Sequence, residues 1–319
     1  MKSIVLVAAM LLSSSVLAQS YPDRPVKVIT PFAAGNTLDT ALRIVGDEFR
    51  KQTGQTLLVE NRPGGSGFIA AQAVANAAPD GYTLLLGNTS MLTVNPHTFK
   101  SLPYDPEKSF RPITNFLGAT MVFAANAAPN GGNLAEYIVW ARANRGKSNF
   151  ASFTAGNSSH FAGVILNQRA GIEMLHVPFN GTPPAVTNLL AGEVQTAFLP
   201  LLAVRPHVAS NKVKVFAVTS PQRSPLLPDV PTFRELGYPE LDIYIWASIM
   251  APAALPDTIA ERLNTEFVRA LRAADVREKW RAMDFTPLPS TPAEFTDFMR
   301  AESRRWGEAV KASGFKSNE

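Results

Sequence analysis

Strand-like and helix-like segments alternate along this chain, and no other feature constrains its fold as strongly. Runs rich in aliphatic and β-branched residues at 26–30, 56–60 and 82–86 are separated by helical stripes at 38–52 and 68–78. Strands separated by helices of this length are typical of βαβ units, which build parallel sheets. The pattern starts again after residue 134, so the sequence predicts an α/β fold with two such halves.

The second half is bounded by two extended apolar segments, 115–127 and 241–251, which lie beside proline-rich loops. If both segments are crossing strands, the chain enters a second lobe, then returns and packs its C-terminal helices on the first lobe. We therefore expect lobe one to comprise residues 19–120 and 245–319, and lobe two residues 121–244. The expected helices of the second half are 134–143, 161–168 and 184–190, and its expected strands are 150–153, 174–177, 194–198 and 213–219.

The N-terminus has the pattern of a secretory signal peptide over residues 1–18. Lys2 precedes a short apolar run, 4–12, and small residues lead to a cleavage site that we place after Ala18, with Ser20 as the second choice. The apolar run is shorter than the ~20 residues that span a membrane, and a short membrane anchor is the alternative. We therefore expect the mature chain to be exported.

Composition excludes several classes of protein. The chain has no cysteine, which rules out a disulfide scaffold, thiolate zinc sites and a cysteine nucleophile. Its 30 basic and 26 acidic residues give a net charge of +4 without a run of five Lys or Arg, so no nucleic-acid partner is expected. Apolar residues make up 46% of the chain, enough for a core that needs no crosslinks.

The loops that follow four of the expected strands carry the same chemistry: a glycine, an amide and a hydroxyl. Ligands of open α/β sheets bind beyond the carboxyl ends of the strands. Glycine lets the backbone approach a ligand closely, and the free N–H groups of a helix's first turn favour an anion. The sequence therefore predicts that neutral donors hold a carboxylate, with ordinary turns and helix caps as the alternative. The loops are 35–37, 87–90, 156–159 and 180–182.

Enzymatic motifs in the sequence are incomplete. The glycines at 65 and 67 fit a loose dinucleotide-binding pattern, but the next strand ends without the acidic residue that a ribose requires. His160 beside Ser158 and Ser159 suggests a hydrolase, although it occupies the position where a nucleophile elbow has its second glycine. A secreted serine hydrolase remains the competing class. We expect no cofactor and no metal, because the histidines lack paired ligand spacing.

Short motifs along the whole mature chain resemble the Bug family, also called the tripartite tricarboxylate transporter or TctC-like substrate-binding proteins. Each motif is short, but their order and spacing are specific. They stand at 21–25, 31–35, 60–65, 79–84, 156–160, 176–185, 229–232, 235–237, 246 and 251–252.

The resemblance implies a two-lobed periplasmic binding protein of the Venus-flytrap, type II-like kind. Each lobe would be a mostly parallel sheet flanked by helices, and the two crossing segments would form the hinge. The implied protein is a monomeric periplasmic receptor, not an enzyme, that delivers a small carboxylate to integral membrane transporter components. A receptor that presents its ligand to a membrane sensor is the other alternative.

The resemblance also places the ligand contacts by position. The loop from Phe32 to Asp39 would hold one carboxylate, partly through ordered water. The implied lobe-one contacts are Phe32, Ala33, Ala34, Gly35, Asn36, Asp39, Asn88, Thr89 and Ser90. The implied lobe-two contacts are Ala155, Ser158, His160, Phe179, Thr182, Ala185 and Leu199.

Three positions depart from the family pattern and bear on the ligand. Asn36 replaces a second glycine, Phe179 and the next residue replace Tyr-Lys, and Leu199 stands where an acidic residue is common. Without an acidic residue to pair with a ligand's ammonium group, an amino acid is disfavoured as the ligand. The lack of arginine in these loops disfavours a tricarboxylate. With Phe32, Phe179 and Leu199 as an apolar wall, we expect an aromatic or aliphatic mono- or dicarboxylate.

Overall fold

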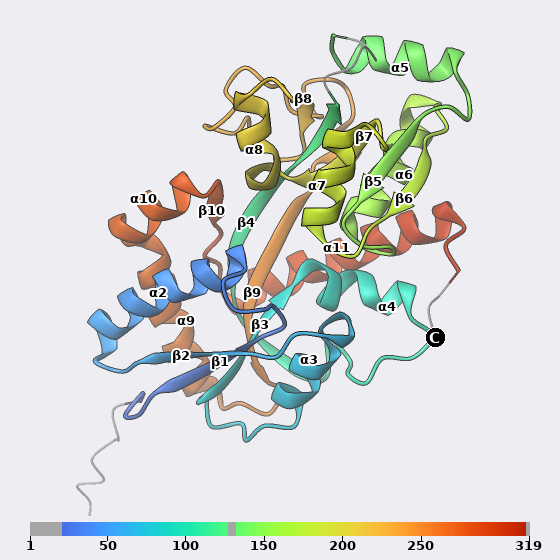
Figure 1. Ribbon diagram of the computed structural model, residues 1–319. Coiled ribbons are helices and arrows are strands. Elements are labelled where there is room, and N and C mark those ends of the chain that lie inside the picture. The colour runs from blue at the N-terminus through green and yellow to red at the C-terminus, as the bar shows by residue number, and fades with distance from the viewer. Residues whose placement is uncertain (1–20, 127–131, 317–319) are drawn as a thin grey trace, which may run out of the picture.

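The computed structural model describes residues 21–126 and 132–316, so the predicted signal peptide and its cleavage sites lie outside the described residues. Strands and helices alternate along the chain as predicted (Figure 1). The first half comprises β1 (Val26–Thr30), α2 (Thr37–Thr53), β2 (Leu57–Asn61), α3 (Phe68–Ala75), β3 (Thr83–Asn88), a π-helical turn (Ser90–Val94), α4 (Asn95–Thr98) and the long strand β4 (Phe110–Asn126).

The second half repeats the alternation and ends in a helical tail. It comprises α5 (Leu134–Ala143), β5 (Asn149–Ser152), α6 (Ser158–Ala170), β6 (Leu175–Pro178), α7 (Thr182–Ala191), β7 (Thr196–Pro200), α8 (Leu201–Ala209) and β8 (Val213–Val218). The tail comprises β9 (Tyr244–Pro252), α9 (Asp257–Arg272), α10 (Ala274–Ala282), β10 (Phe285–Pro287) and α11 (Pro292–Ser313). The sequence patterns do not predict α8, which follows β7 directly and contains Pro206.

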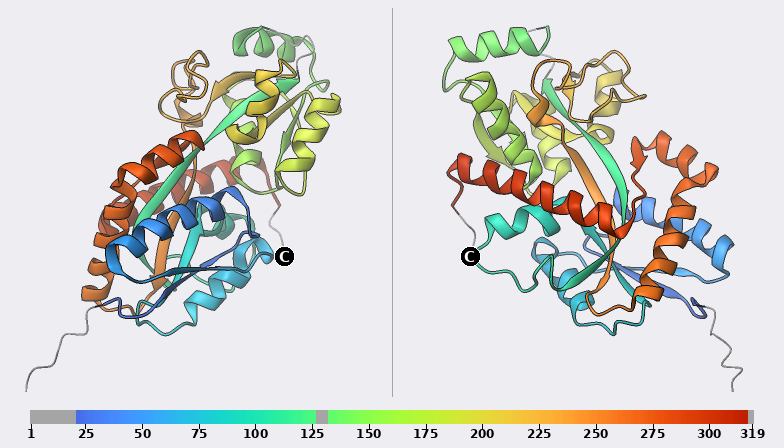
Figure 2. Two further views of the ribbon diagram at one scale, coloured as in Figure 1. Left: turned by 60° about the vertical axis from the view of Figure 1, so that its left-hand side comes forward. Right: turned by 180° about the vertical axis from the view of Figure 1, so that it is seen from behind.

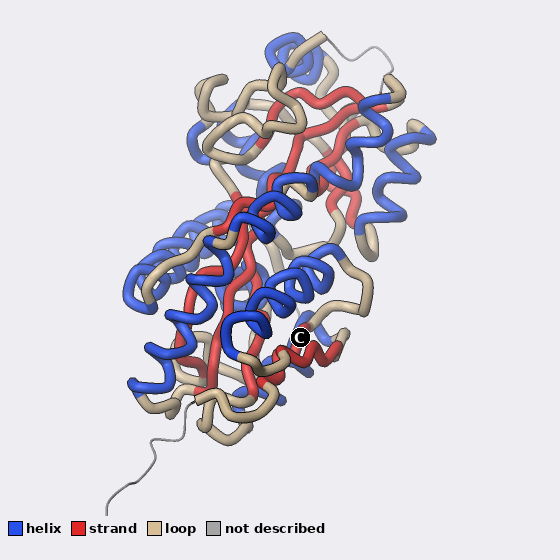
Figure 3. The backbone as a smooth tube through the Cα atoms, turned by 90° about the vertical axis from the view of Figure 1, so that its left-hand side faces the viewer, coloured by secondary structure: helices blue, strands red, loops and turns tan. Residues whose placement is uncertain are grey.

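Strand β4 connects the two lobes. It pairs with β9 as far as Thr120, with β7 from Met121 onward and with β8 from Val122 onward, so one strand belongs to two sheets. The strand order is β2-β1-β3-β9-β4-β7-β5-β6, with β8 and β10 also paired to β4. Figures 2 and 3 show β4 and β9 side by side as the chain passes between the lobes.

Each sheet is mixed rather than mostly parallel, which corrects the expectation drawn from the alternation of strands and helices. Within lobe one, β1 pairs in parallel with β2 and β3, but β9 is antiparallel to both of its neighbours, β3 and β4. Within lobe two, β5 is parallel to β6 and β7, whereas β4 is antiparallel to β7 and β8. The crossing strands therefore add antiparallel pairs to each parallel core.

Helices cover both faces of each sheet. In lobe one, α2, α9 and α10 bury one cluster that includes Phe49 and Trp280. Helix α11 departs from the expectation that the C-terminal helices pack on lobe one. Its first half contributes Phe295 to a lobe-one cluster, but its second half contributes Trp306 to the lobe-two core. Helix α11 therefore crosses between the lobes, as the right-hand view of Figure 2 shows.

Thr219, just after β8, joins the two crossing segments. Its hydroxyl oxygen lies 2.9 Å from the Met121 carbonyl oxygen on β4 and 2.7 Å from the Ile243 carbonyl oxygen before β9. The N–H of Ile243 donates in turn to the Thr219 carbonyl at 2.7 Å. Thr219 thus bridges the two segments about which the lobes would turn, through both its side chain and its backbone.

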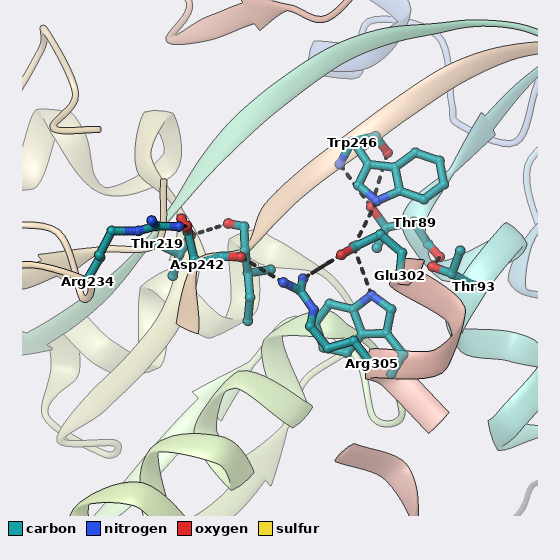
Figure 4. Close-up of polar contacts among 10 residues, drawn as sticks. Thr89, Thr93, Thr219, Arg234, Asp242, Trp246, Glu302 and Arg305 are labelled. Atoms are coloured by element: carbon teal, nitrogen blue, oxygen red, sulfur yellow. Dashed lines mark hydrogen bonds and ion pairs between the residues drawn. The ribbon is translucent and has the colours of Figure 1, made fainter. Parts of the chain in front are cut away.

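A second polar cluster connects α11 to the same region (Figure 4). Glu302 accepts hydrogen bonds from the Trp246 and Trp306 indole N–H groups, each at 3.2 Å, and forms an ion pair with Arg305 at 2.9 Å. Arg305 also donates to the Asp242 carbonyl at 2.8 Å. No helix of the described residues is long and apolar enough to cross a membrane.

Candidate functional site

The strand register brings the carboxyl ends of both sets of parallel strands to the junction between the lobes. Asn88, the last residue of β3, is level with Ala247 of β9, which in turn is level with Leu117 of β4. In lobe two, Pro200 at the end of β7 is level with Met121 of β4. Since β1 runs parallel to β3, and β5 and β6 run parallel to β7, the loops after all five strands point toward the other lobe.

The loop after β1 exposes backbone donors. Ala33, Ala34, Gly35 and Asn36 are exposed, and Phe32 is half-buried. Gly35 has φ +80°, which a residue with a Cβ adopts only under strain. The N–H groups of Ala33 and Ala34 donate to no group within the described part of the chain. This loop therefore offers two unpaired donors next to the start of α2.

Asp39 anchors this loop rather than facing solvent. Its side chain is 2% exposed, and its carboxylate accepts hydrogen bonds from the Gly35 N–H at 3.0 Å, from Asn61 at 2.8 Å and from Arg43 at 3.0 Å and 3.2 Å. Burial alone raises the pKa of Asp39, but these hydrogen bonds outweigh it and hold the pKa below its ordinary value. The geometry makes Asp39 a positioning residue. Arg43 and Asn61 hold its carboxylate in place, and the sequence patterns did not predict either of these two partners.

The segment after β3 contributes a second group of polar side chains from lobe one. The Thr89 hydroxyl accepts from the Trp246 N–H at 2.9 Å and donates to its carbonyl at 3.2 Å, so Thr89 is used to tie β3 to β9. Asn88 accepts from the Met91 N–H at 3.1 Å, which leaves its amide N–H₂ without a partner among the described residues. Ser90 is half-buried.

The N-terminus of α6 is held by Asn157. Its side-chain oxygen accepts from the N–H groups of Ser159 at 3.0 Å and His160 at 3.2 Å, and from the Ser159 hydroxyl at 2.7 Å. The Ser159 hydroxyl also accepts from the Phe153 N–H at 3.2 Å. Ser158 is 2% exposed, and neither its N–H nor its hydroxyl has a hydrogen-bond partner in the described residues.

The remaining predicted contacts of lobe two divide into loop and core residues. Ala155 is exposed, and Thr182 at the start of α7 is half-buried with an unpaired hydroxyl within the residues described. The Gly181 N–H donates to the Phe153 carbonyl at 2.8 Å, which ties two strand-end loops together. Phe179 is half-buried and packs against an apolar cluster that contains Ala185 and Leu199. Ala185 and Leu199 are completely buried in this cluster, so their contact with a ligand stays a prediction.

His160 lies in the first turn of α6, where its Nδ1 accepts from the Gly156 N–H at 3.2 Å. Its ring stacks on His176 of β6, with 3.7 Å between centroids and 8° between planes. Burial lowers the pKa of His160 to about 4, so the imidazole is neutral near pH 7. The sequence treats His176 as one of several scattered histidines, and nothing in its spacing predicts this contact.

Two large surface cavities lie away from these loops. One, of about 790 Å³, lies between α11 and the residues around Tyr104, and the other, of about 780 Å³, lies between α2 and α9. Neither is lined by a predicted contact residue. We favour the strand-end loops as the site, because unpaired N–H groups on converging strand ends have the chemistry that an anion requires.

Known proteins of the same fold bind small acids. A family model described as "Tripartite tricarboxylate transporter family receptor" matches residues 41–315. The periplasmic binding protein BugD is 31% identical, with a TM-score of 0.79 over 93% of this chain and 100% of its own. An R. palustris protein solved with adipate is 27% identical, with a TM-score of 0.83 over 93% and 100%. MatC from Rhodopseudomonas palustris, solved with bound malate, is 32% identical, with a TM-score of 0.76 over 91% and 100%.

Proposed function

The chain belongs to the tripartite tricarboxylate transporter receptor family of periplasmic solute-binding proteins, and we propose that it captures an aromatic or aliphatic mono- or dicarboxylate for such a transporter. The observation that carries this proposal is the set of unpaired neutral donors on strand ends that converge from both lobes. They include the N–H groups of Ala33 and Ala34 in lobe one, and the Ser158 and Thr182 hydroxyls in lobe two.

The charge of the site supports a plain acid of low charge. Asp39 is the one carboxylate among the proposed contacts, and its oxygens already accept four hydrogen bonds. No proposed contact is an arginine or a lysine. Half-buried Phe32 and Phe179 would face the apolar part of the ligand, and the acids bound by two relatives, adipate and malate, belong to this class.

Closure on the ligand would be a hinge motion about β4 and the segment that precedes β9. We propose lobe boundaries at 120/121 and 244/245, where β4 changes partners and the return segment meets Thr219. Contacts from both lobes favour the closed state, because a ligand stabilises the conformation that binds it best. We propose that the mature receptor acts as a monomer in the periplasm.

The geometry does not favour a serine hydrolase. The Ser159 hydroxyl donates to Asn157, and the Nδ1 atom of His160 accepts from the Gly156 N–H, so neither serine is hydrogen-bonded to His160. A nucleophilic serine requires a base within hydrogen-bond reach and a group that orients the base. Ester turnover by the purified protein that disappears in both Ser158→Ala and His160→Ala variants would favour the hydrolase instead.

A thermal-shift screen with adipate, malate, benzoate, citrate and glutamate tests the ligand class. A ligand that binds only the folded protein adds ~2.7 kcal/mol of stability at 100 times its Kd. We expect adipate, malate or benzoate to raise Tm, and calorimetry to give one site per chain. A shift by glutamate alone, or by citrate alone, contradicts the proposed class, and no shift by any acid contradicts the proposed function.

Delivery to a transporter needs a separate test, because a sensor would recognise the same closed receptor. Uptake of the radiolabelled acid in a deletion strain should return when the receptor is restored. Normal uptake without the receptor, combined with loss of a transcriptional response to the acid, would favour the sensory role.

A further inference from the structure

A stacked pair of histidines lies beneath the N-terminus of α6. The pair is formed by His160 of α6 and His176 of β6. In the parallel pairing of β5 with β6, His176 stands opposite Phe150, and Ser152 lies two residues further along β5 on the same face. His160 follows the loop at 156–159 that the proposed function uses, and His176 lies within β6, two residues before its carboxyl end.

Hydrogen bonds assign the protons of both rings. The Gly156 N–H donates to Nδ1 of His160, so this nitrogen carries no proton and the ring proton is on Nε2. The Nε2 atom of His176 lies 2.7 Å from the Ser152 hydroxyl oxygen, and the hydroxyl proton is directed to the Thr154 carbonyl at 3.0 Å. His176 therefore donates to Ser152 through its own Nε2–H.

The surroundings keep both rings uncharged. His160 contacts Phe161 and Phe315 besides His176, and Phe150 lies on His176 at 5.0 Å between centroids. None of these phenylalanines titrates, so His176 is the one titratable group whose ring contacts His160 in the residues described. Burial, and to a smaller extent the neighbouring His160 ring, lower the pKa of His176 to about 3. A hydrogen-bonded, neutral imidazole has a fixed tautomer.

Nδ1 of His176 and Nε2 of His160 have no hydrogen-bond partner among the residues that the structure describes, and with the protons assigned above the Nε2–H of His160 is the one N–H donor of the pair left unpaired. We propose that His176 is a positioning residue: anchored by Ser152, it holds the His160 ring flat so that His160 accepts the Gly156 N–H and presents Nε2–H to the bound acid. This inference rests on the proposed function for the acid, but the tautomer and the stacking can be measured without it.

The first measurement uses the wild-type protein without ligand. Nitrogen-15 NMR of the imidazoles at pH 7 should show His160 protonated at Nε2 and not at Nδ1, and should show the same tautomer for His176. A proton on Nδ1 of His160 overturns the proposal. This readout remains valid if no acid in the panel binds, so failure of the inference and failure of the proposed function are distinguishable.

The second measurement compares two residues of similar size at position 176. His176→Phe keeps a flat ring over His160, whereas His176→Leu fills space without stacking. We expect the Leu variant to weaken binding of the best acid of the panel about tenfold and the Phe variant to remain within about threefold of wild type. We also expect the His160 tautomer to become mixed in the Leu variant only. Equal affinities for the two variants overturn the positioning role.

His97 provides the matched control, because its Nε2 atom also lies 3.0 Å from a serine hydroxyl, that of Ser303, but it belongs to α4 and not to a strand-end loop. His97→Leu should leave the affinity unchanged. If the Leu variant at 176 does not fold, Ser152→Ala removes only the anchor and should weaken binding about threefold. Unchanged affinity with an unchanged His160 tautomer in Ser152→Ala overturns the proposal.

Discussion

The two lobes hold similar loops by opposite chemical means. In lobe one, the loop after β1 is fixed by an ionised carboxylate, Asp39, which is buried beside Arg43 and Asn61. In lobe two, the loop after β5 is fixed by neutral groups, the Asn157 amide and the His160 imidazole. Both arrangements leave backbone N–H groups unpaired at the strand ends, so different anchors produce equivalent donors. The contrast teaches that the anchors, rather than the donors, set how each half of the site responds to pH and salt.

Replacing the anchor of lobe one should have the largest effect. Asp39→Ala leaves the Gly35 N–H, Asn61 and Arg43 without their shared acceptor, and breaking a buried ion pair is costly. Because Arg43 is half-exposed, we expect a loss of about 3 kcal/mol in the free energy of unfolding, with loss of acid binding. Urea denaturation of both forms measures the loss. A change below about 1 kcal/mol would remove the proposed contrast between the lobes.

Acidification should affect lobe two first. The pKa of His160 is lowered to about 4 and that of His176 to about 3, so between pH 6.5 and 4 the unfolded chain binds protons that the folded chain does not. Stability therefore falls as pH falls through this window, by about 2 kcal/mol for the partly exposed pair. Asp39, with its lowered pKa, contributes stability that is lost only below this range.

Hydrogen exchange at pH 7 and at pH 4.5 measures this difference between the lobes. Amides of α6 should lose protection before those of α2. A His160→Phe, His176→Phe double variant serves as the control, because it should lose the extra pH dependence. If the amides of α2 lose protection before those of α6, lobe one and not lobe two responds first to acid.

Removing the anchor of lobe two should cost less than removing Asp39. Asn157→Ala deletes a cap that accepts three hydrogen bonds, and we expect a loss of about 1 to 2 kcal/mol in the free energy of unfolding. Asn157→Asp, which retains the acceptor, should recover most of this loss. If Asn157→Ala proves as costly as Asp39→Ala, the neutral anchor is as strong as the charged one.

The smallest effect is expected for Arg43. Its side chain is 50% exposed, and Asp39 keeps Asn61 and the Gly35 N–H when Arg43 is replaced. Arg43→Gln should therefore cost about 0.5 to 1 kcal/mol, and the cost should shrink in high salt. Urea denaturation of wild type and Arg43→Gln in 1 M and in 0.05 M NaCl measures how much of the stability loss is screened by salt. A salt-independent cost would mean that Arg43 acts through packing.

Periodicity was sufficient for the α/β class and for the alternation of strands and helices in both halves of the chain. The two-lobed α/β fold and the family are confirmed. The sequence missed α8, because an apolar start that continues β7 and an internal Pro206 conceal a helix. The sequence patterns also predicted that Gly87 and Asn88 belong to a loop, although both are part of β3.

The side-chain roles within the site were harder to predict than its position. Position in the chain cannot distinguish Asp39, which turns inward to anchor a loop, from a residue that meets a ligand. It also cannot reveal that Ala185 and Leu199 face the core or that His176 meets His160, because these contacts depend on how separate elements pack. Contacts made between elements are set by tertiary packing, which local patterns do not encode.

The path of α11 has a consequence for building a fluorescent biosensor. The helix starts on lobe one and ends at Ser313, and Phe315, two residues further on, lies against the His160 ring, so a dye near the end of the helix would lie beside the lobe-two half of the site. Ala312 is exposed there, and the natural chain has no cysteine to compete for a thiol-reactive dye. An Ala312→Cys variant would therefore carry one label at one defined place, and its emission should report the arrival of the acid directly.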